Sequence, residues 1–204
     1  MLAQCGIVGC ISRRVIVFGA AIVPARVGVA NSLSLKPGID QAEFGPTMGA
    51  MVSEAQRDRA VGMICAAQEE GAGIAAGGHK ANIPGAFLEP TVLTDVLPEM
   101  SIAQEEVFGP VVSVLKFSTD GEAIQIANGT PFGLVGGVFT RDLDRATSAA
   151  RQLRAGQVFV NEWYAGGVET PFGGFGKSGY GREKGREALW NYVQTKNIAI
   201  KLQD

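Results

Sequence analysis

Residues 111–140 read VVSVLKFSTDGEAIQIANGTPFGLVGGVFT, and this stretch decides the fold. Its first seven residues are almost entirely apolar, as in a buried strand. Thr119 and Glu122 form a capping box, which starts a helix that we expect to end at Asn128, just before a glycine. Residues 133–140 again predict a strand. Because parallel strands are joined by a crossover helix, this unit predicts an α/β fold with a mostly parallel sheet.

The same alternation continues on both sides of this unit. Ser53 opens another capping box, S-E-A-Q, and the helix after it places Val61, Ile64 and Ala67 on one side. The remaining expected elements are strands at 13–20, 72–78, 87–93 and 157–161, a helix at 142–155, a short helix at 186–194 and a final strand at 197–202. The sequence therefore predicts one α/β domain with flanking helices.

Composition excludes several classes of protein. The chain has 204 residues, 46% of them hydrophobic and 19% charged, which is typical of a globular domain with a substantial core. A net charge of −2 provides no basic field for nucleic acid or for an acidic membrane surface. No stretch reaches the ~20 apolar residues of a membrane span. We therefore expect no nucleic-acid or membrane partner.

The cysteines and the histidine bear on compartment and chemistry. Three cysteines, Cys5, Cys10 and Cys65, form no disulfide framework, which favours a reducing, cytoplasmic location. The twin arginine at 13–14 before an apolar run could instead belong to an export signal, although Arg26 interrupts that run. We expect no metal site, and the single histidine argues against a Ser-His-Asp triad. Cys65 is expected to be a small buried residue of its helix.

Two further segments carry unusual residues. In the glycine-rich loop 168–185, the spacing G-x-G-x-x-G occurs, but no strand precedes it and no helix follows at once, so we interpret it as a tightly folded backbone segment rather than a dinucleotide loop. The stretch AQEEVFGPVV, 103–112, places two carboxylates and an aromatic ring just before a buried strand. This stretch could be a simple helix-to-strand connector with solvated glutamates, or it could form part of a site at the end of a strand.

Taken together, the motifs resemble one family. EEVFGP (105–110), GLVGGVFT (133–140), AGQVFVN (155–161), ETPFGG, KSGYGRE and YVQTKNIAI occur in the order and spacing seen in the aldehyde dehydrogenase superfamily. The resemblance extends over residues 13–202. It implies oxidation of an aldehyde to a carboxylic acid with NAD or NADP, through a thiohemiacetal on a cysteine.

The resemblance also implies a domain organisation. Chains of this family contain a dinucleotide-binding domain, a catalytic domain and an oligomerisation strand. We expect residues 1–196 to match the catalytic domain, with the first 12 or so divergent, and residues 197–204 to match the oligomerisation strand. The dinucleotide-binding domain is expected to be absent. The implied partners are a small aldehyde or ester substrate, a second copy of the chain in a dimer, and a separate chain supplying the cofactor domain.

Site residues follow from the resemblance by position. Glu106 and Phe108 match the residues that hold the nicotinamide ribose and ring, and Glu183 matches a glutamate assigned to proton relay. The residues matching the substrate site are Asn161, which ends a strand behind it, and three aromatic side chains that line the aldehyde pocket, Trp163, Tyr164 and Phe172. Aromatic walls with few polar groups suit a small apolar substrate.

The position of the nucleophile stays open. The family cysteine stands five residues before an arginine, which here leads from Arg13 to Val8, and valine cannot attack an aldehyde. Cys10 would serve after the loss of one residue and Cys5 after the insertion of three. Three hypotheses remain: a dehydrogenase that needs its cofactor domain, a cofactor-independent cysteine esterase, and a non-catalytic assembly module.

Overall fold

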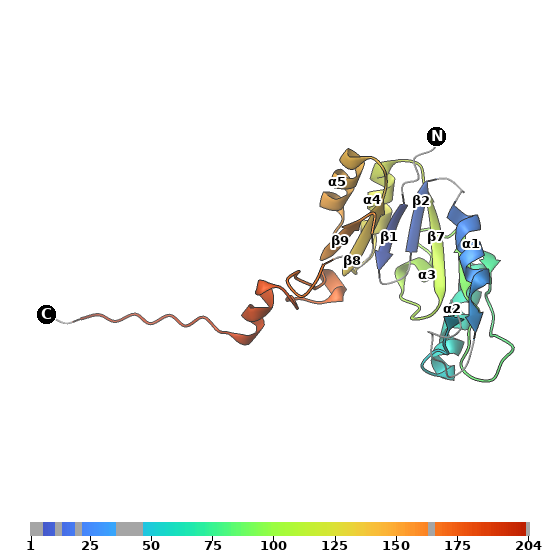
Figure 1. The fold of residues 1–204 in the computed structure, drawn as a ribbon, viewed down its shortest axis with the longest axis horizontal. Coiled ribbons are helices and arrows are strands. Elements are labelled where there is room, and N and C mark those ends of the chain that lie inside the picture. Colours follow the sequence, from blue (N-terminus) through green and yellow to red (C-terminus); the bar gives the residue numbers. More distant parts are fainter. Residues whose placement is uncertain (1–5, 11–13, 19–21, 36–46, 163–165, 203–204) are drawn as a thin grey trace.

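The computed structural model describes residues 6–10, 14–18, 22–35, 47–162 and 166–202. A seven-stranded sheet forms the centre of the domain, with helices packed against it and the C-terminal segment projecting to one side (Figure 1). The strands of this sheet are β1 (Gly6–Cys10), β2 (Arg14–Phe18), β5 (Gly73–Ala76), β6 (Thr91–Thr94), β7 (Val111–Phe117), β8 (Val135–Phe139) and β9 (Gln157–Val160). Two short strands, β3 (Ser34–Leu35) and β4 (Thr47–Met48), pair separately.

The helices alternate with these strands along the chain. They are α1 (Ile22–Ser32), α2 (Glu54–Glu69), α3 (Ser101–Gln104), α4 (Asp120–Asn128) and α5 (Leu143–Gln152), followed by the 3₁₀ helices η1 (Gly176–Ser178) and η2 (Arg186–Tyr192). This α/β architecture confirms the fold class predicted from the sequence.

The sheet has the strand order β5-β6-β7-β2-β1-β8-β9. Strands β6, β7 and β2 are parallel to one another, and β8 is parallel to β9. Because β1 is antiparallel to both β2 and β8, those two neighbours run in the same direction. Five strands therefore share one direction, and β1 and β5 are reversed. The prediction of a mostly parallel sheet is correct, but the reversed strand at its centre was not predicted.

The N-cap hydrogen bond of each predicted capping box forms, but the side chain of the third residue goes to another partner: the Gln56 amide donates to the carbonyl of Val107, and the Glu122 carboxylate accepts from Ser118. The Ser53 hydroxyl accepts a hydrogen bond from the backbone N–H of Gln56 at 3.1 Å, at the start of α2. The Thr119 hydroxyl accepts one from the N–H of Glu122 at 3.2 Å, and the Glu122 carboxylate accepts one from the N–H of Ser118 at 2.7 Å. The two bonds to the Ser53 and Thr119 hydroxyls satisfy N–H groups that a helix leaves without a partner, and each joins residues three apart, so both helix starts can be predicted from the sequence.

The core lies mainly on one face of the sheet. On that face alternate residues of β7 pack with buried residues of helices: Val111, Leu115 and Phe117 of the strand, Ala60, Ile64 and Ala67 of α2, and Ala123 and Ile126 of α4. On the other face Val92 and Val114 pack against Val27 and Ala30 of α1. Since β7 is buried on both sides, its sequence is a nearly continuous apolar run.

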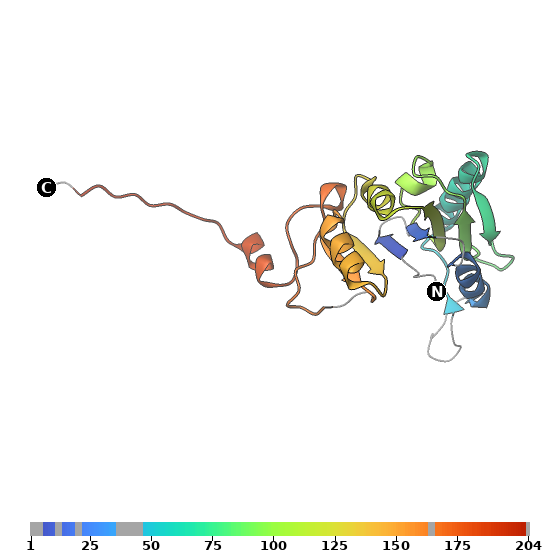
Figure 2. The same ribbon diagram turned by 90° about the horizontal axis from the view of Figure 1, so that it is seen from above.

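The C-terminal segment differs from expectation. Residues 186–192 form the 3₁₀ helix η2, and the predicted strand 197–202 is extended but pairs with no described strand. Figures 1 and 2 show this segment leaving the domain in both views. Trp190, Ile198 and Ile200 are exposed. A strand needs a partner for its N–H and C=O groups, and this segment has none within the described part of the chain.

Candidate functional site

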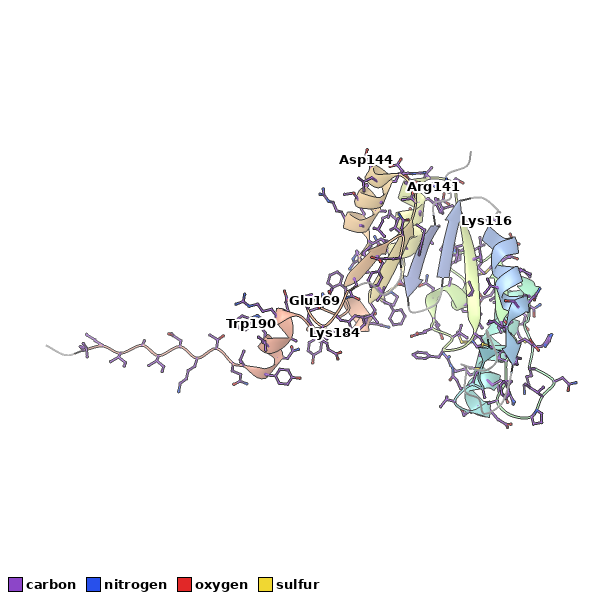
Figure 3. All side chains as sticks on the ribbon, in the orientation of Figure 1. Lys116, Arg141, Asp144, Glu169, Lys184 and Trp190 are labelled. Carbon is purple, nitrogen blue, oxygen red and sulfur yellow. The ribbon has the colours of Figure 1, made fainter. Side chains whose placement is uncertain are left out.

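Most of the candidate residues belong to one edge of the sheet, where the parallel strands begin. Strand β1 is reversed, so its last residue, Cys10, lies at this edge: its backbone pairs with Val135 at the start of β8, and Gly9 pairs with Arg14 at the start of β2. Figure 3 separates the two edges, since Lys116 and Arg141 lie near the ends of β7 and β8, whereas Glu169 and Lys184 lie on the opposite side of the sheet, below β8 and β9.

The segment carrying Glu106 and Phe108 leads into β7 at this same edge. Glu106 is half-buried, and Phe108 has a φ of 51° with 72% of its surface exposed. The carbonyl of Pro110 accepts a hydrogen bond of 2.8 Å from the N–H of Thr91, which ties the segment to the start of β6. A non-glycine residue in the left-handed region is costly and is often found at functional sites.

The glycine-rich loop brings Phe172 and Glu183 to the beginnings of β8 and β9. The N–H of Phe172 donates to the carbonyl of Glu183 at 2.7 Å, and the reverse bond is 2.6 Å. The side chain of Gln157, the first residue of β9, donates to the carbonyl of Pro171 at 3.1 Å. The ammonium of Lys184 lies 5.8 Å from the centre of the Phe172 ring. Phe172 is half-buried, whereas Glu183 is exposed.

The loop is tightly folded, as its glycines indicated. The N–H of Phe175 donates to the carbonyl of Gly133 at 2.9 Å, and the N–H of Gly133 donates to the Ser178 hydroxyl at 3.0 Å. A Cβ atom on Gly174 would overlap Ser178. The Ser178 hydroxyl therefore anchors the loop to the residues just before β8, which supports the interpretation of this motif as a tightly folded backbone segment.

Asn161 lies at the other edge of the sheet, after the last residue of β9. Its side-chain oxygen accepts a hydrogen bond of 2.8 Å from the N–H of Thr140, and its φ is 58°. The bond connects the ends of β8 and β9. The structure thus does not bring Asn161 together with Glu106, Phe108 and Phe172.

Besides Cys10, two further cysteines and the position of Val8 bear on the nucleophile. Cys5, like Trp163 and Tyr164, falls outside the described residues. Val8, the slot suggested by the family spacing, is in the middle of β1 and pairs with Val15 and Gly137. Cys65 is exposed on α2, so the prediction that it is buried was wrong. It follows Ile64, and one residue turns a helix by about 100°, which carries Cys65 out of the buried side.

Two residues near the site were missed by sequence analysis. Gln56 and Arg59 of α2 donate hydrogen bonds to the backbone of the segment 106–108. They come about 50 positions earlier in the chain, and the local pattern indicates only a capping-box role for Gln56 within its own helix.

Within the described ranges, no three His, Cys, Asp or Glu side chains gather in a way that could hold a metal ion. Nor does any helix of those ranges have the length and apolar character needed to cross a membrane.

Comparison with known proteins gives consistent matches. The family model described as "Aldehyde dehydrogenase family" matches residues 10–198. A betaine aldehyde dehydrogenase of Cereibacter sphaeroides is 46% identical over 153 residues, which cover 75% of this chain and 32% of that protein. "Aldehyde dehydrogenase, cytosolic 1" of Rattus norvegicus is 42% identical over 160 residues, covering 78% of this chain and 32% of the relative.

Solved structures agree with these matches. The NAD+ complex of an aldehyde dehydrogenase from Bacillus cereus superposes with a TM-score of 0.85 at 39% identity, covering 93% of this chain and 39% of that one. A betaine aldehyde dehydrogenase from Staphylococcus aureus, also in complex with NAD+, has a TM-score of 0.84 at 37% identity, covering 91% and 38%. The chain spans about a third of the length of the curated relatives it matches.

Proposed function

This chain belongs to the aldehyde dehydrogenase family. We propose that the edge of the sheet where the parallel strands begin contributes to a site that oxidises an aldehyde to a carboxylic acid with NAD or NADP. Since the chain spans a third of its relatives, this activity is a proposal for the assembly in which the chain works. The similar structures solved with NAD+ support the choice of cofactor class.

The position of Cys10 carries the proposal. Neighbouring strands are about 4.8 Å apart, so two strand spacings put the backbone of Cys10 about 10 Å from the start of β7 and about 10 Å from the start of β9. Glu106 and Phe108 lie on the first side, and Phe172 lies on the second. The backbone of Cys10 thus lies between the half-buried Glu106 with the exposed Phe108 on one side and Phe172 on the other, which supports a nucleophilic role for this residue.

The residues present fit the nicotinamide end of the cofactor. The exposed ring of Phe108 offers a face for a flat heterocycle, and the Glu106 carboxylate can accept hydrogen bonds from ribose hydroxyls. When bound, the nicotinamide accepts a hydride from the substrate carbon. Phe108 and Glu106 orient that end of the cofactor, and the remainder of the dinucleotide requires further protein surface.

The chain's own chemistry is nucleophilic. The Cys10 thiolate attacks the aldehyde carbon, a C–S bond forms, and the electron pair of the C=O bond moves to the oxygen. Phe172 excludes water from one side of the substrate. After oxidation the thioester is cleaved by water, for which the Glu183 carboxylate accepts the proton, and the acid leaves while the thiol is restored.

A cofactor-independent esterase is the second candidate, and the same position of Cys10 favours it. Attack of the thiol on an ester followed by hydrolysis needs the nucleophile and the proton acceptor but no hydride acceptor. The third candidate, a non-catalytic assembly module, is favoured by Val8 at the slot where the family spacing expects the nucleophile.

The experiment that separates these candidates uses the purified chain, NAD or NADP, an aldehyde panel beginning with betaine aldehyde, and an activated ester. The names of several relatives make betaine aldehyde the first substrate to test. Formation of NADH that disappears in Cys10→Ala supports the dehydrogenase. Ester cleavage without NADH formation supports the esterase, and inactivity in both assays, including after addition of a dinucleotide-binding domain of a relative, supports the assembly module.

We also propose that the chain works as a dimer in the cytoplasm. The exposed apolar side chains of residues 189–202 support self-association, and a matched rat relative is named as cytosolic.

A further inference from the structure

The segment 105–108 contains a residue, Phe108, whose backbone conformation needs support from neighbouring residues. Phe108 is in the left-handed region with a φ of 51°, a backbone conformation that costs free energy for any residue with a Cβ atom. Its ring is 72% exposed, so burial of the ring does not stabilise this conformation. Val107, by contrast, is only 4% exposed. Some other contact has to stabilise the backbone of Phe108.

Helix α2 supplies that contact. The amide nitrogen of Gln56 lies 2.9 Å from the carbonyl oxygen of Val107 and 3.4 Å from that of Phe108. One side-chain amide therefore bridges two successive carbonyls with its two N–H groups. Gln56 is half-buried, so water competes less for these bonds than at an open surface.

Arg59, one turn further along α2, makes a second contact with the same segment. Its guanidinium nitrogen lies 3.3 Å from the carbonyl oxygen of Glu106, and another lies 3.6 Å from the carboxylate of Glu105. Because residues three apart on a helix share a face, Gln56 and Arg59 reach successive carbonyls of the same segment. Arg59 is exposed, so its contribution is the weaker of the two.

We propose that Gln56 is a positioning residue: its side-chain amide fixes the carbonyls of Val107 and Phe108 and so holds the Phe108 ring out at the sheet edge. This inference deepens the proposed function, since it rests on Phe108 and Glu106 facing the nicotinamide end of the dinucleotide. Gln56 acts on these two residues through the backbone that carries them.

The test replaces the donor with an acceptor of the same size. Gln56→Glu keeps the length of the side chain but removes both N–H groups and points a carboxylate at two carbonyls. Gln68→Glu is the matched control, because Gln68 is on the same helix, is exposed and makes no side-chain hydrogen bond within the described residues. The probe is para-fluorophenylalanine introduced at Phe108 alone and observed by fluorine NMR.

We expect one sharp resonance in the otherwise unchanged chain and in Gln68→Glu. In Gln56→Glu we expect a second resonance, with the population of the alternative loop conformation raised about threefold to tenfold, as the loss of a partly buried hydrogen bond predicts. A fluorine probe at Phe172 should not respond, because among the described residues no hydrogen bond joins that loop to the Gln56 side chain. General destabilisation would change thermal unfolding without moving the Phe108 resonance of the native state.

An unchanged Phe108 resonance in a folded Gln56→Glu protein would overturn the proposal. If that variant does not fold, Gln56→Leu, which removes the donors without adding charge, gives the same comparison. Titration with NADH in the presence of a dinucleotide-binding domain of a relative tests the proposed function separately: no response of the Phe108 probe in the unchanged chain contradicts a cofactor role for this segment, while the loop populations still decide the role of Gln56.

Discussion

Gly156 passes so close to the carbonyl oxygen of Gly173 that a Cβ atom on Gly156 would overlap it. Gly156 precedes β9, and Gly173 follows Phe172. The contact seats the glycine-rich loop against the beginning of the sheet, together with the hydrogen bond from Gln157 to Pro171. The placement of Phe172 therefore depends on the absence of a side chain at one position.

We predict that Gly156→Ala destabilises the fold by about 1–3 kcal/mol, because either the loop or the turn before β9 has to move. Urea unfolding followed by circular dichroism measures this difference. Gly62→Ala is the control: a Cβ there meets nothing within 4 Å, and the position is inside α2. That change should stabilise the protein by about 0.5–1 kcal/mol. Equal stability of Gly156→Ala and the unchanged chain would contradict the packing described here.

Cys10→Ala should reduce the hydrolysis of an activated ester to the rate of buffer, since no other described thiol lies at the candidate edge. Cys65→Ala should leave the rate unchanged, because Cys65 is exposed on α2 and belongs to no candidate site. Stopped-flow or plate assays with both variants decide the matter. Full activity in Cys10→Ala would transfer the nucleophile to Cys5 or exclude a thiol mechanism.

The ion pair between Asp120 and Arg145 predicts a dependence of stability on pH. The guanidinium donates to Asp120 Oδ2 at 2.8 Å, and this hydrogen bond together with the nearby positive charge lowers the pKa of Asp120 below its ordinary 3.8, although burial acts in the opposite direction. A lowered pKa means that the stabilisation is present above 3.8 and is lost as the pH falls through the lowered value.

Asp120→Asn should therefore cost about 0.5 kcal/mol at neutral pH, a small value because both side chains contact solvent, and nothing in strong acid. Thermal unfolding of both proteins at pH 7 and pH 2 measures this. Asp144→Asn is the control, since Asp144 is also in the first turn of a helix but forms no ion pair among the described residues. A difference between Asp120→Asn and the unchanged chain that persisted in acid would show that the ion pair is not its cause.

The C-terminal segment predicts self-association. Ile198 and Ile200 alternate with Ala199, so in an extended chain they point to one side, and both are exposed. We expect light scattering to report a dimer at micromolar concentration and a lower mass for the double variant Ile198→Asp, Ile200→Asp. Ala199→Asp adds a charge on the other side and should keep the dimer. A monomeric unchanged chain would refute this prediction.

Local patterns were sufficient for much of the fold. The helices α2 and α4 begin at Ser53 and Thr119, because a capping box is a contact between residues three apart and is visible in the sequence. The bounds of β7 could be predicted to the residue, since a strand buried on both faces leaves a continuous apolar run. The likeness to aldehyde dehydrogenases was also present in the order of the motifs, and the family match confirms it.

What only the tertiary structure decided is which residues share an edge. The sequence did not indicate that β1 runs against β2 and β8, yet that reversal places the backbone of Cys10 at the beginning of the parallel strands and leaves Asn161 at their other end. The hydrogen bond from Gln56 to Val107 could not be predicted from the sequence either, because it joins residues 51 positions apart. Strand direction and contacts of this range depend on how helices and strands pack together, and no local pattern of residue types records that packing.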